Sequence, residues 1–135
     1  MKRSLLDTNI ITAFLKGNIT VVERVEQYIN EYESLTISII SYYEILRGLK
    51  ALGSKKKLQA FNRFMNDCEV EELEISVIEM AAEIYVELKN QGNLVEDADI
   101  FVAATALDKG FVVVTDNEKH FKRIKGLEVE NWPKQ

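Results

Sequence analysis

Four acidic residues stand at positions where carboxylates could do chemistry, at the end of short apolar runs or near the start of a helix. They are Asp7 after residues 4–6, Glu44 one helical turn after residues 35–40, Asp99 near the start of a helix over residues 97–109, and Asp116 after residues 111–115. If these runs are parallel strands, the four acids lie at one end of the sheet. Functional groups of open α/β sheets gather at that end.

Carboxylates gathered in one crevice repel one another, so their pKa values rise unless a cation neutralises them. No basic side chain is expected to do so, because Lys16, Lys109 and His120 lie at the far ends of helices or in a later helix. A divalent cation is the simpler neutraliser. Oxygen ligands suit Mg²⁺ or Mn²⁺, and the presence of only one histidine and one cysteine argues against zinc. Such acid-only sites perform phosphoryl chemistry, so the expected substrate is a phosphodiester or a phosphomonoester.

Each acid also has a purely structural explanation. The alternatives are that Asp7 or Thr8 caps a helix, that Ser41 and Glu44 form a capping box, that Glu96, Asp97 and Asp99 complement a helix dipole, and that Asp116 and Asn117 form a turn. Taken singly, the capping box is the stronger explanation for Glu44. The metal hypothesis depends on all four acids converging.

The elements that must position these acids alternate between strand and helix. Hydrophobic periodicity predicts strands over residues 4–6, 35–40, 70–75, 111–115 and 127–130, and helices over 8–16, 20–33, 41–52, 56–67, 77–92, 97–109 and 118–123. Such alternation predicts an α/β fold with a mostly parallel sheet covered on both faces, because parallel neighbours need crossover connections. No linker divides the chain, so we expect one domain over residues 1–135.

Composition narrows the class of protein further. Hydrophobic residues make up 47% and charged residues 29%, as in soluble globular proteins, and no apolar run is long enough to cross a membrane. Cys68, in a helix-like stretch, is expected to be a small buried thiol in a reducing cytoplasm. The net charge of −5 disfavours general nucleic-acid binding, so contact with nucleic acid would need local basic patches.

With these residues in place, the sequence resembles PIN domains, and more narrowly the VapC-type toxin ribonucleases. The similar segments are LLDTNII (5–11), ISYYEILRGL (40–49), DADIFVAATALDKG (97–110) and VVTDNEKHFKRIKGLEVENW (113–132). The resemblance implies a three-layer PIN-like fold and a magnesium-dependent endoribonuclease that acts on structured RNA such as tRNA or rRNA. It also implies inhibition by a cognate VapB-like antitoxin and a homodimer.

The resemblance assigns roles to individual residues. Asp7, Glu44 and Asp99 match the first three acidic positions, with Asp7 and Asp99 as the main metal ligands, and Asn9, Ser41 and Thr115 match polar residues that support the carboxylates. The fullest PIN pattern has Thr-x-Asp after the last core strand, whereas this chain has Thr115-Asp116-Asn117. We therefore expect Asp116 to act in the outer sphere or at a second ion, with Asn117 in the usual acidic slot.

RNA contact is expected from Arg47, which lies three residues after Glu44 and would face the same mouth. Lys55, Lys56 and Lys57 are weaker candidates, since lysine runs usually mark solvated helix ends. Aromatic and apolar excess in two helices hints at a surface for an antitoxin or a second subunit, with core packing as the alternative. The residues are Tyr28, Tyr32, Phe61, Phe64 and Met65.

Two other functions compete with the nuclease hypothesis. A haloacid-dehalogenase-type phosphatase would need a second Asp two positions after Asp7, where this chain has Asn9. A PIN-fold interaction module with a degenerate pocket is consistent with Asn117 but not with the retained Asp7, Glu44 and Asp99.

Overall fold

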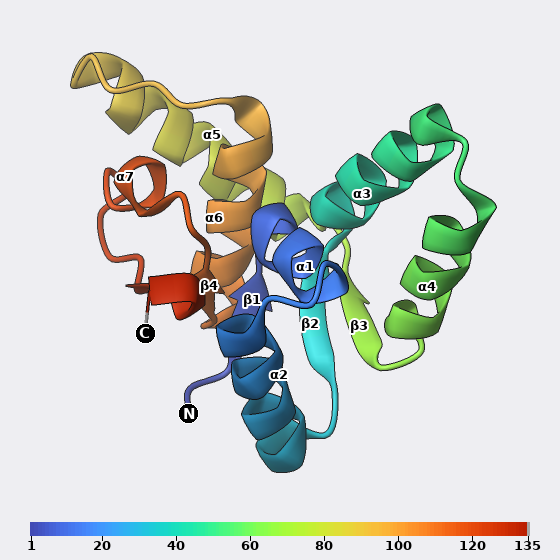
Figure 1. Ribbon diagram of the computed structural model, residues 1–135. Coiled ribbons are helices and arrows are strands. Elements are labelled where there is room, and N and C mark those ends of the chain that lie inside the picture. Colours follow the sequence, from blue (N-terminus) through green and yellow to red (C-terminus); the bar gives the residue numbers. More distant parts are fainter. Residues whose placement is uncertain (135) are drawn as a thin grey trace.

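Five parallel strands form one sheet in the order β3-β2-β1-β4-β5 in the computed structural model, which describes residues 1–134 (Figure 1). The strands are β1 (Ser4–Leu6), β2 (Leu35–Ser38), β3 (Cys68–Glu71), β4 (Val112–Val114) and β5 (Val129–Glu130). The helices are α1 (Thr8–Leu15), α2 (Ile19–Tyr32), α3 (Ile39–Leu52), α4 (Lys55–Met65), α5 (Ile75–Asn90), α6 (Asp97–Lys109) and α7 (Glu118–Phe121), followed by the 3₁₀ turn η1 (Trp132–Lys134). The expected α/β class with a parallel sheet is confirmed.

The strand order reverses beside β1. The chain passes from β1 to β2 and β3 on one side, then returns to place β4 and β5 on the other. Leu6 pairs with Val114, and the next backbone N–H, that of Asp7, donates to the Val114 carbonyl at 2.9 Å. The carboxyl ends of β1 and β4 therefore meet at the switch point where ligands bind in open α/β sheets.

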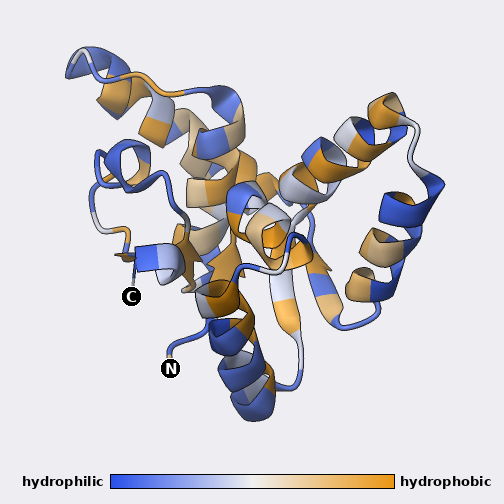
Figure 2. Cartoon of the chain, in the orientation of Figure 1, coloured by the Kyte–Doolittle hydropathy of each residue, from blue (hydrophilic) through white to orange (hydrophobic). Residues whose placement is uncertain are grey.

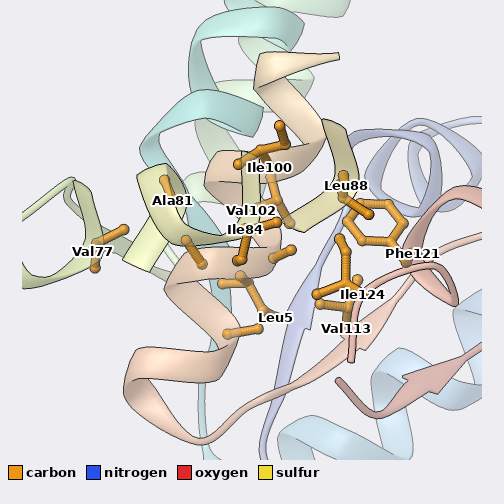
Figure 3. Packing of buried hydrophobic residues seen from close by; sticks show 13 residues of the cluster. Leu5, Val77, Ala81, Ile84, Leu88, Ile100, Val102, Val113, Phe121 and Ile124 are labelled. Atoms are coloured by element: carbon orange, nitrogen blue, oxygen red, sulfur yellow. The ribbon is translucent and has the colours of Figure 1, made fainter. Parts of the chain in front are cut away.

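Successive strand residues point to opposite faces, and each face has its own core. Leu5 and Val113 pack with side chains of α5, α6 and α7, as Figure 3 shows. Leu6 and Val114 pack on the other face with side chains of α1 to α4 and with Trp132. Because both faces are covered, β1 and β4 are fully buried, which explains why these strands have no polar alternation.

Two predicted strands have the wrong bounds. Residues 39 and 40 belong to α3, so the β2 strand ends at Ser38. The third strand is Cys68–Glu71, paired with β2, and residue 75 already begins α5. The β-branched Ile39 and Ile40 and the alternation of 70–75 imitate a strand, but pairing with the short β2 limits β3 to four residues.

Cys68 consequently lies in a strand, not in a helix as expected. Its side chain is only partly buried, and its Sγ lies 3.4 Å from the Phe64 carbonyl oxygen, which accepts the hydrogen bond. Burial raises the pKa of the Cys68 thiol to about 12. The thiol is therefore protonated at neutral pH and has a structural role.

The N-cap of α3 is Ser38 rather than Ser41. The Ser38 hydroxyl accepts a hydrogen bond from the Ile40 backbone N–H at 3.1 Å. Ser41 lies one turn inside the helix, fully buried, and its Oγ has no hydrogen-bond partner among residues 1–134. The capping-box explanation for Glu44 is therefore wrong, because its proposed partner is not a cap.

This difference between the two serines is testable. Replacing Ser38 by Ala should lower the free energy of unfolding by about 1 kcal/mol, since the cap hydrogen bond is lost. Replacing Ser41 by Ala should leave stability unchanged or raise it, because a buried hydroxyl without a partner is removed. Urea unfolding of both variants measures the difference. The opposite order would show that Ser41 caps the helix.

The aromatic residues expected on a partner surface lie instead mostly in the core. Tyr28, Phe61 and Phe64 are buried, which supports the core-packing alternative. Exposed apolar side chains are found elsewhere, notably on α5, where Ile75 is 78% and Val86 54% exposed. Figure 2 shows the hydrophobic colouring that continues along α5. None of the helices in residues 1–134 combines the length and the hydrophobicity that crossing a membrane requires.

Candidate active site

A hollow of about 550 Å³ lies at the carboxyl ends of β1 and β4. Side chains from α1, α3, α6 and the segment after β4 line it. They are Asp7, Thr8, Asn9, Thr12, Ala13, Lys16, Glu44, Asp99, Asp116 and Asn117. The four acids predicted from the sequence thus share one hollow, although 109 residues of sequence separate the first from the last.

Asp7 is the most enclosed of the four acids, with 5% of its surface exposed. Its Oδ1 accepts from the Thr8 backbone N–H at 2.9 Å, so it caps α1 as the structural alternative proposed. Its Oδ2 accepts from the Thr115 hydroxyl at 2.8 Å and from Asn9 Nδ2 at 3.1 Å. Asp7 is therefore both a helix cap and a fixed carboxylate, and the two roles do not compete.

The pKa of Asp7 is raised to about 6. Burial is the main cause, and the nearby Asp99 and Glu44 carboxylates raise the pKa further. The hydrogen bonds from Thr115 and Thr8 act in the opposite direction by stabilising the ionised form. Asp7 therefore ionises near neutral pH at an energetic cost, which a bound cation would offset.

A hydrogen-bond network connects the end of β1 to the segment after β4. Asn9 Oδ1 accepts from the Asp116 backbone N–H at 3.1 Å, while the Thr115 hydroxyl accepts from the Asn117 backbone N–H at 2.9 Å. Asn9 and Thr115 thus support Asp7, in agreement with the roles that the resemblance implied. Asp116 is exposed at the rim, and Asn117 lies in the lining.

Glu44 is held by α1. Thr8 Oγ1 donates to Glu44 Oε1 at 2.8 Å and so connects the first turn of α1 to α3. Ser41, expected to support the carboxylates, makes no such hydrogen bond in residues 1–134. Its place inside α3, buried against the core, leaves Thr8 as the hydroxyl that orients Glu44. The sequence signal for Thr8 was its position beside Asp7, where capping was the only role considered.

Asp99 has a cationic partner that the sequence analysis excluded. His120 Nδ1 lies 3.1 Å from Asp99 Oδ2 and 2.9 Å from Asn117 Nδ2. Burial raises the pKa of Asp99, and the hydrogen bond and charge of His120 oppose that rise. The expectation that no histidine reaches the strand ends is wrong, because α7 turns back over the start of α6.

A second cation also differs from the prediction. Lys16, at the end of α1, lines the acidic hollow, whereas Arg47 does not. Arg47 stacks on Tyr43, with its Cζ 5.1 Å from the ring centroid, on an exposed part of α3. Spacing of three residues from Glu44 placed Arg47 on a similar helix face, but the side chain turns toward Tyr43.

The donor set of the hollow fits a hard divalent cation. Asp7, Glu44 and Asp99 supply carboxylate oxygens alone, and their mutual repulsion favours a bound positive charge. Within residues 1–134, no three Asp, Glu, His or Cys side chains are already arranged to hold one ion. Mg²⁺ needs no such cage, because it keeps several waters and binds proteins through one or two carboxylates.

A second, mainly apolar groove of about 390 Å³ adjoins the acidic hollow. It runs between α1, α3 and α4 and shares Thr8, Thr12, Lys16 and Glu44 with the hollow. The remaining lining is Leu15, Ile45, Gly48, Leu49, Leu52, Lys57 and Ala60. Sequence analysis missed this groove because these residues look like the ordinary core stripes of three separate helices.

Comparison with known proteins agrees with this geometry. Residues 4–127 match the PIN domain family. Ribonuclease VapC1 of Methanocaldococcus jannaschii is 32% identical over 127 residues, which cover 93% of this chain and 85% of that protein. The tRNA(fMet)-specific endonuclease VapC of Salmonella typhimurium is 30% identical over 134 residues, covering 98% and 99% of the two chains.

The fold similarity extends to a solved complex. A chain in the crystal structure of DNA-bound VapBC from Salmonella typhimurium superposes with a TM-score of 0.87 at 29% identity, covering 98% of this chain and 99% of that one. The family match spans most of the chain, and the relatives align over nearly their whole length. The chain therefore belongs to the PIN-domain family and, within it, to the VapC ribonucleases.

Proposed function

We propose that this chain is a magnesium- or manganese-dependent endoribonuclease, the cytoplasmic toxin of a VapC-type toxin–antitoxin pair, with residues 1–135 as one domain. The observation that supports it most is the convergence of Asp7, Glu44 and Asp99 on one hollow at the sheet's switch point. The three carboxylates come from different elements, so local helix capping does not explain their meeting.

In this proposal, Asp7 and Asp99 are the main metal ligands, and Glu44 completes the acidic set. The cation, when bound, activates water for attack on phosphorus and stabilises charge on the leaving oxygen. The chain's own residues position the carboxylates: Thr115 and Asn9 fix Asp7, and Thr8 orients Glu44. No nucleophilic side chain is required, since water attacks directly. Asp116, exposed at the rim, is proposed to contribute in the outer sphere or at a second ion.

The proposed substrate is structured RNA, tRNA or rRNA. One relative is named a tRNA(fMet)-specific endonuclease, which supports tRNA as the first substrate to test. Arg47 keeps its proposed role in RNA contact, although from the exposed outer side of α3 and not from the hollow.

The proposed partners are a VapB-like antitoxin and a second copy of the chain. Solved VapBC complexes with similar chains support the antitoxin, and the apolar groove between α1, α3 and α4 offers a surface for it beside the acids. For the homodimer, α5 offers exposed apolar side chains, namely Ile75, Ile78, Tyr85 and Val86.

Two alternatives predict different outcomes in the same assay. A phosphatase needs a second acid two residues after Asp7, but Asn9 there acts as a support, donating to Asp7 and accepting from the Asp116 backbone. An interaction module with a degenerate pocket would lack activity altogether.

Incubation of the purified chain with tRNA and rRNA fragments tests the proposal. The protein is first unfolded and refolded to remove any copurified inhibitor. We expect internal cleavage with Mg²⁺ or Mn²⁺ and none with EDTA, and sequencing of the new ends identifies the site. Hydrolysis of p-nitrophenyl phosphate without RNA cleavage would favour the phosphatase. Inactivity with both metals on every RNA would favour the module.

A further inference from the structure

Basic residues are concentrated in one segment of this acidic protein. Between Ile45 and Asn66 the chain has six basic residues and no acidic one, although its net charge is −5. The six are Arg47, Lys50, Lys55, Lys56, Lys57 and Arg63. The rest of the chain therefore contains all 22 acidic residues against 11 basic ones. RNA approaching any other face meets, on balance, negative charge.

The segment forms a distinct part of the fold, the α3–α4 arm (residues 39–65). Figure 1 shows α3 and α4 lying beyond the β3 side of the sheet, away from α5 and α7. Figure 2 shows that the first turn of α4, which holds Lys55 to Lys57, is hydrophilic. All six basic residues are exposed. The charge of the arm therefore faces solvent.

The basic side chains of the arm have no acidic partners. None of the six takes part in an ion pair within residues 1–134, whereas Lys2, Lys109 and Lys122 elsewhere are each paired with a carboxylate. Arg47 contacts only the ring of Tyr43 among charged or aromatic groups described there, and that tyrosine is 57% exposed. Six like charges on one arm repel one another, and phosphates would relieve that repulsion.

The arm is continuous with the proposed active site. Lys57 lines the groove between α1, α3 and α4, and that groove shares Lys16 and Glu44 with the acidic hollow. A strand whose scissile phosphate lies in the hollow can therefore pass Lys16 and reach Lys57 and the rest of the arm. The acidic hollow itself repels RNA, so affinity must come from a neighbouring basic surface.

We infer that the α3–α4 arm binds the phosphate backbone of RNA outside the acidic hollow, on the same molecule that cleaves it. This inference rests on the proposed ribonuclease function. It adds that most of the RNA-binding affinity comes from Arg47, Lys50, Lys55, Lys56, Lys57 and Arg63. It also implies a preference for RNA long enough to span hollow and arm. The exposed Tyr43–Arg47 pair can stack on an unpaired base beside these phosphates.

Binding measured without catalysis tests the arm. In an Asp7→Asn background with EDTA, RNA affinity is measured against salt concentration for Lys50→Gln/Lys57→Gln and for the control Lys89→Gln/Lys134→Gln. Both pairs change the net charge equally, but the control residues lie on α5 and η1. Each lost phosphate contact on single-stranded RNA should lower the slope of log K against log salt by about 0.7, so the arm pair should lower it by about 1.4.

Kinetics in the active protein give an independent measurement. The arm pair should raise KM for a full-length tRNA by roughly 10-fold with kcat nearly unchanged, because two phosphate contacts are lost outside the hollow. A trinucleotide too short to reach the arm should be cleaved equally by wild type and variant. The control pair should change neither value.

Two results would overturn the inference. Equal losses in the arm and control pairs would mean that net charge alone matters. An unchanged slope in the arm pair, while wild type still cleaves RNA, would mean that the basic arm serves a protein partner and not RNA. Absence of cleavage by wild type with either metal would instead refute the proposed function, so the two failures are distinguishable.

Discussion

Replacing Asp7 by Asn should reduce the rate of RNA cleavage about 1000-fold, which corresponds to about 4 kcal/mol of lost transition-state stabilisation. The substitution preserves the shape of the side chain and its ability to accept from the Thr8 backbone N–H. It removes the charge with which Asp7 would hold the cation, and it places a donor beside Asn9 and Thr115. Single-turnover cleavage of a tRNA in Mg²⁺ measures the loss.

Asp97→Asn is the matched control for this experiment. Asp97 lies in the first turn of α6 with Asp99, is exposed, and does not line the hollow, so its loss should change the rate less than about 2-fold. Asp99→Asn should resemble Asp7→Asn. If Asp7→Asn retains more than about a tenth of wild-type activity, Asp7 is not a required metal ligand and the proposed site is wrong.

The metal-free protein should lose stability as the pH rises from about 4 to about 6. The pKa of Asp7 is about 6 in the folded state, against an ordinary value of 3.8, so the folded state binds more protons than the unfolded state within this window. Stability is therefore highest below the unfolded pKa and falls as pH rises through the folded pKa. The total loss is about 3 kcal/mol by pH 7.

Asp7→Asn should flatten this pH dependence, since the buried charge is gone. At pH 7 without metal the variant should be more stable than wild type by about 1–2 kcal/mol, less than the full penalty because hydrogen bonds to the carboxylate are also lost. Urea unfolding in EDTA at several pH values measures both effects. Asp97→Asn should follow the wild-type curve. An identical pH dependence in wild type and Asp7→Asn would contradict the raised pKa.

Added Mg²⁺ should reverse the loss in wild type. The ion binds only the assembled carboxylates, so at 100 times its dissociation constant it stabilises the folded state by about 2.7 kcal/mol. The effect should be larger at pH 7 than at pH 5, because protons compete for the same oxygens. Asp7→Asn should show little of this stabilisation. The same side chain thus lowers metal-free stability and supports activity.

The sequence alone determined the fold class and the acids of the site. Hydrophobic runs such as 4–6 and 112–114 have no polar alternation, because both faces of the sheet are covered. Strand and helix alternation then requires parallel pairing, and parallel pairing places the carboxyl ends of β1 and β4 at one edge. Asp7 was therefore predictable as a site residue from its position one step past a buried strand.

Only the tertiary structure decided which side chains contact these acids. His120 reaches Asp99, Thr8 orients Glu44, and Lys16 lines the hollow in place of Arg47. These pairs depend on the angles at which α1, α3, α6 and α7 pack, and periodicity along a single helix contains no information about that. The cap of α3 and the bounds of β3 were also undetermined, since Ser38 and Ser41 fit the same local pattern and the length of β3 depends on its pairing with β2. Periodicity reports which face of an element is buried, whereas contacts between elements depend on packing that brings distant residues together.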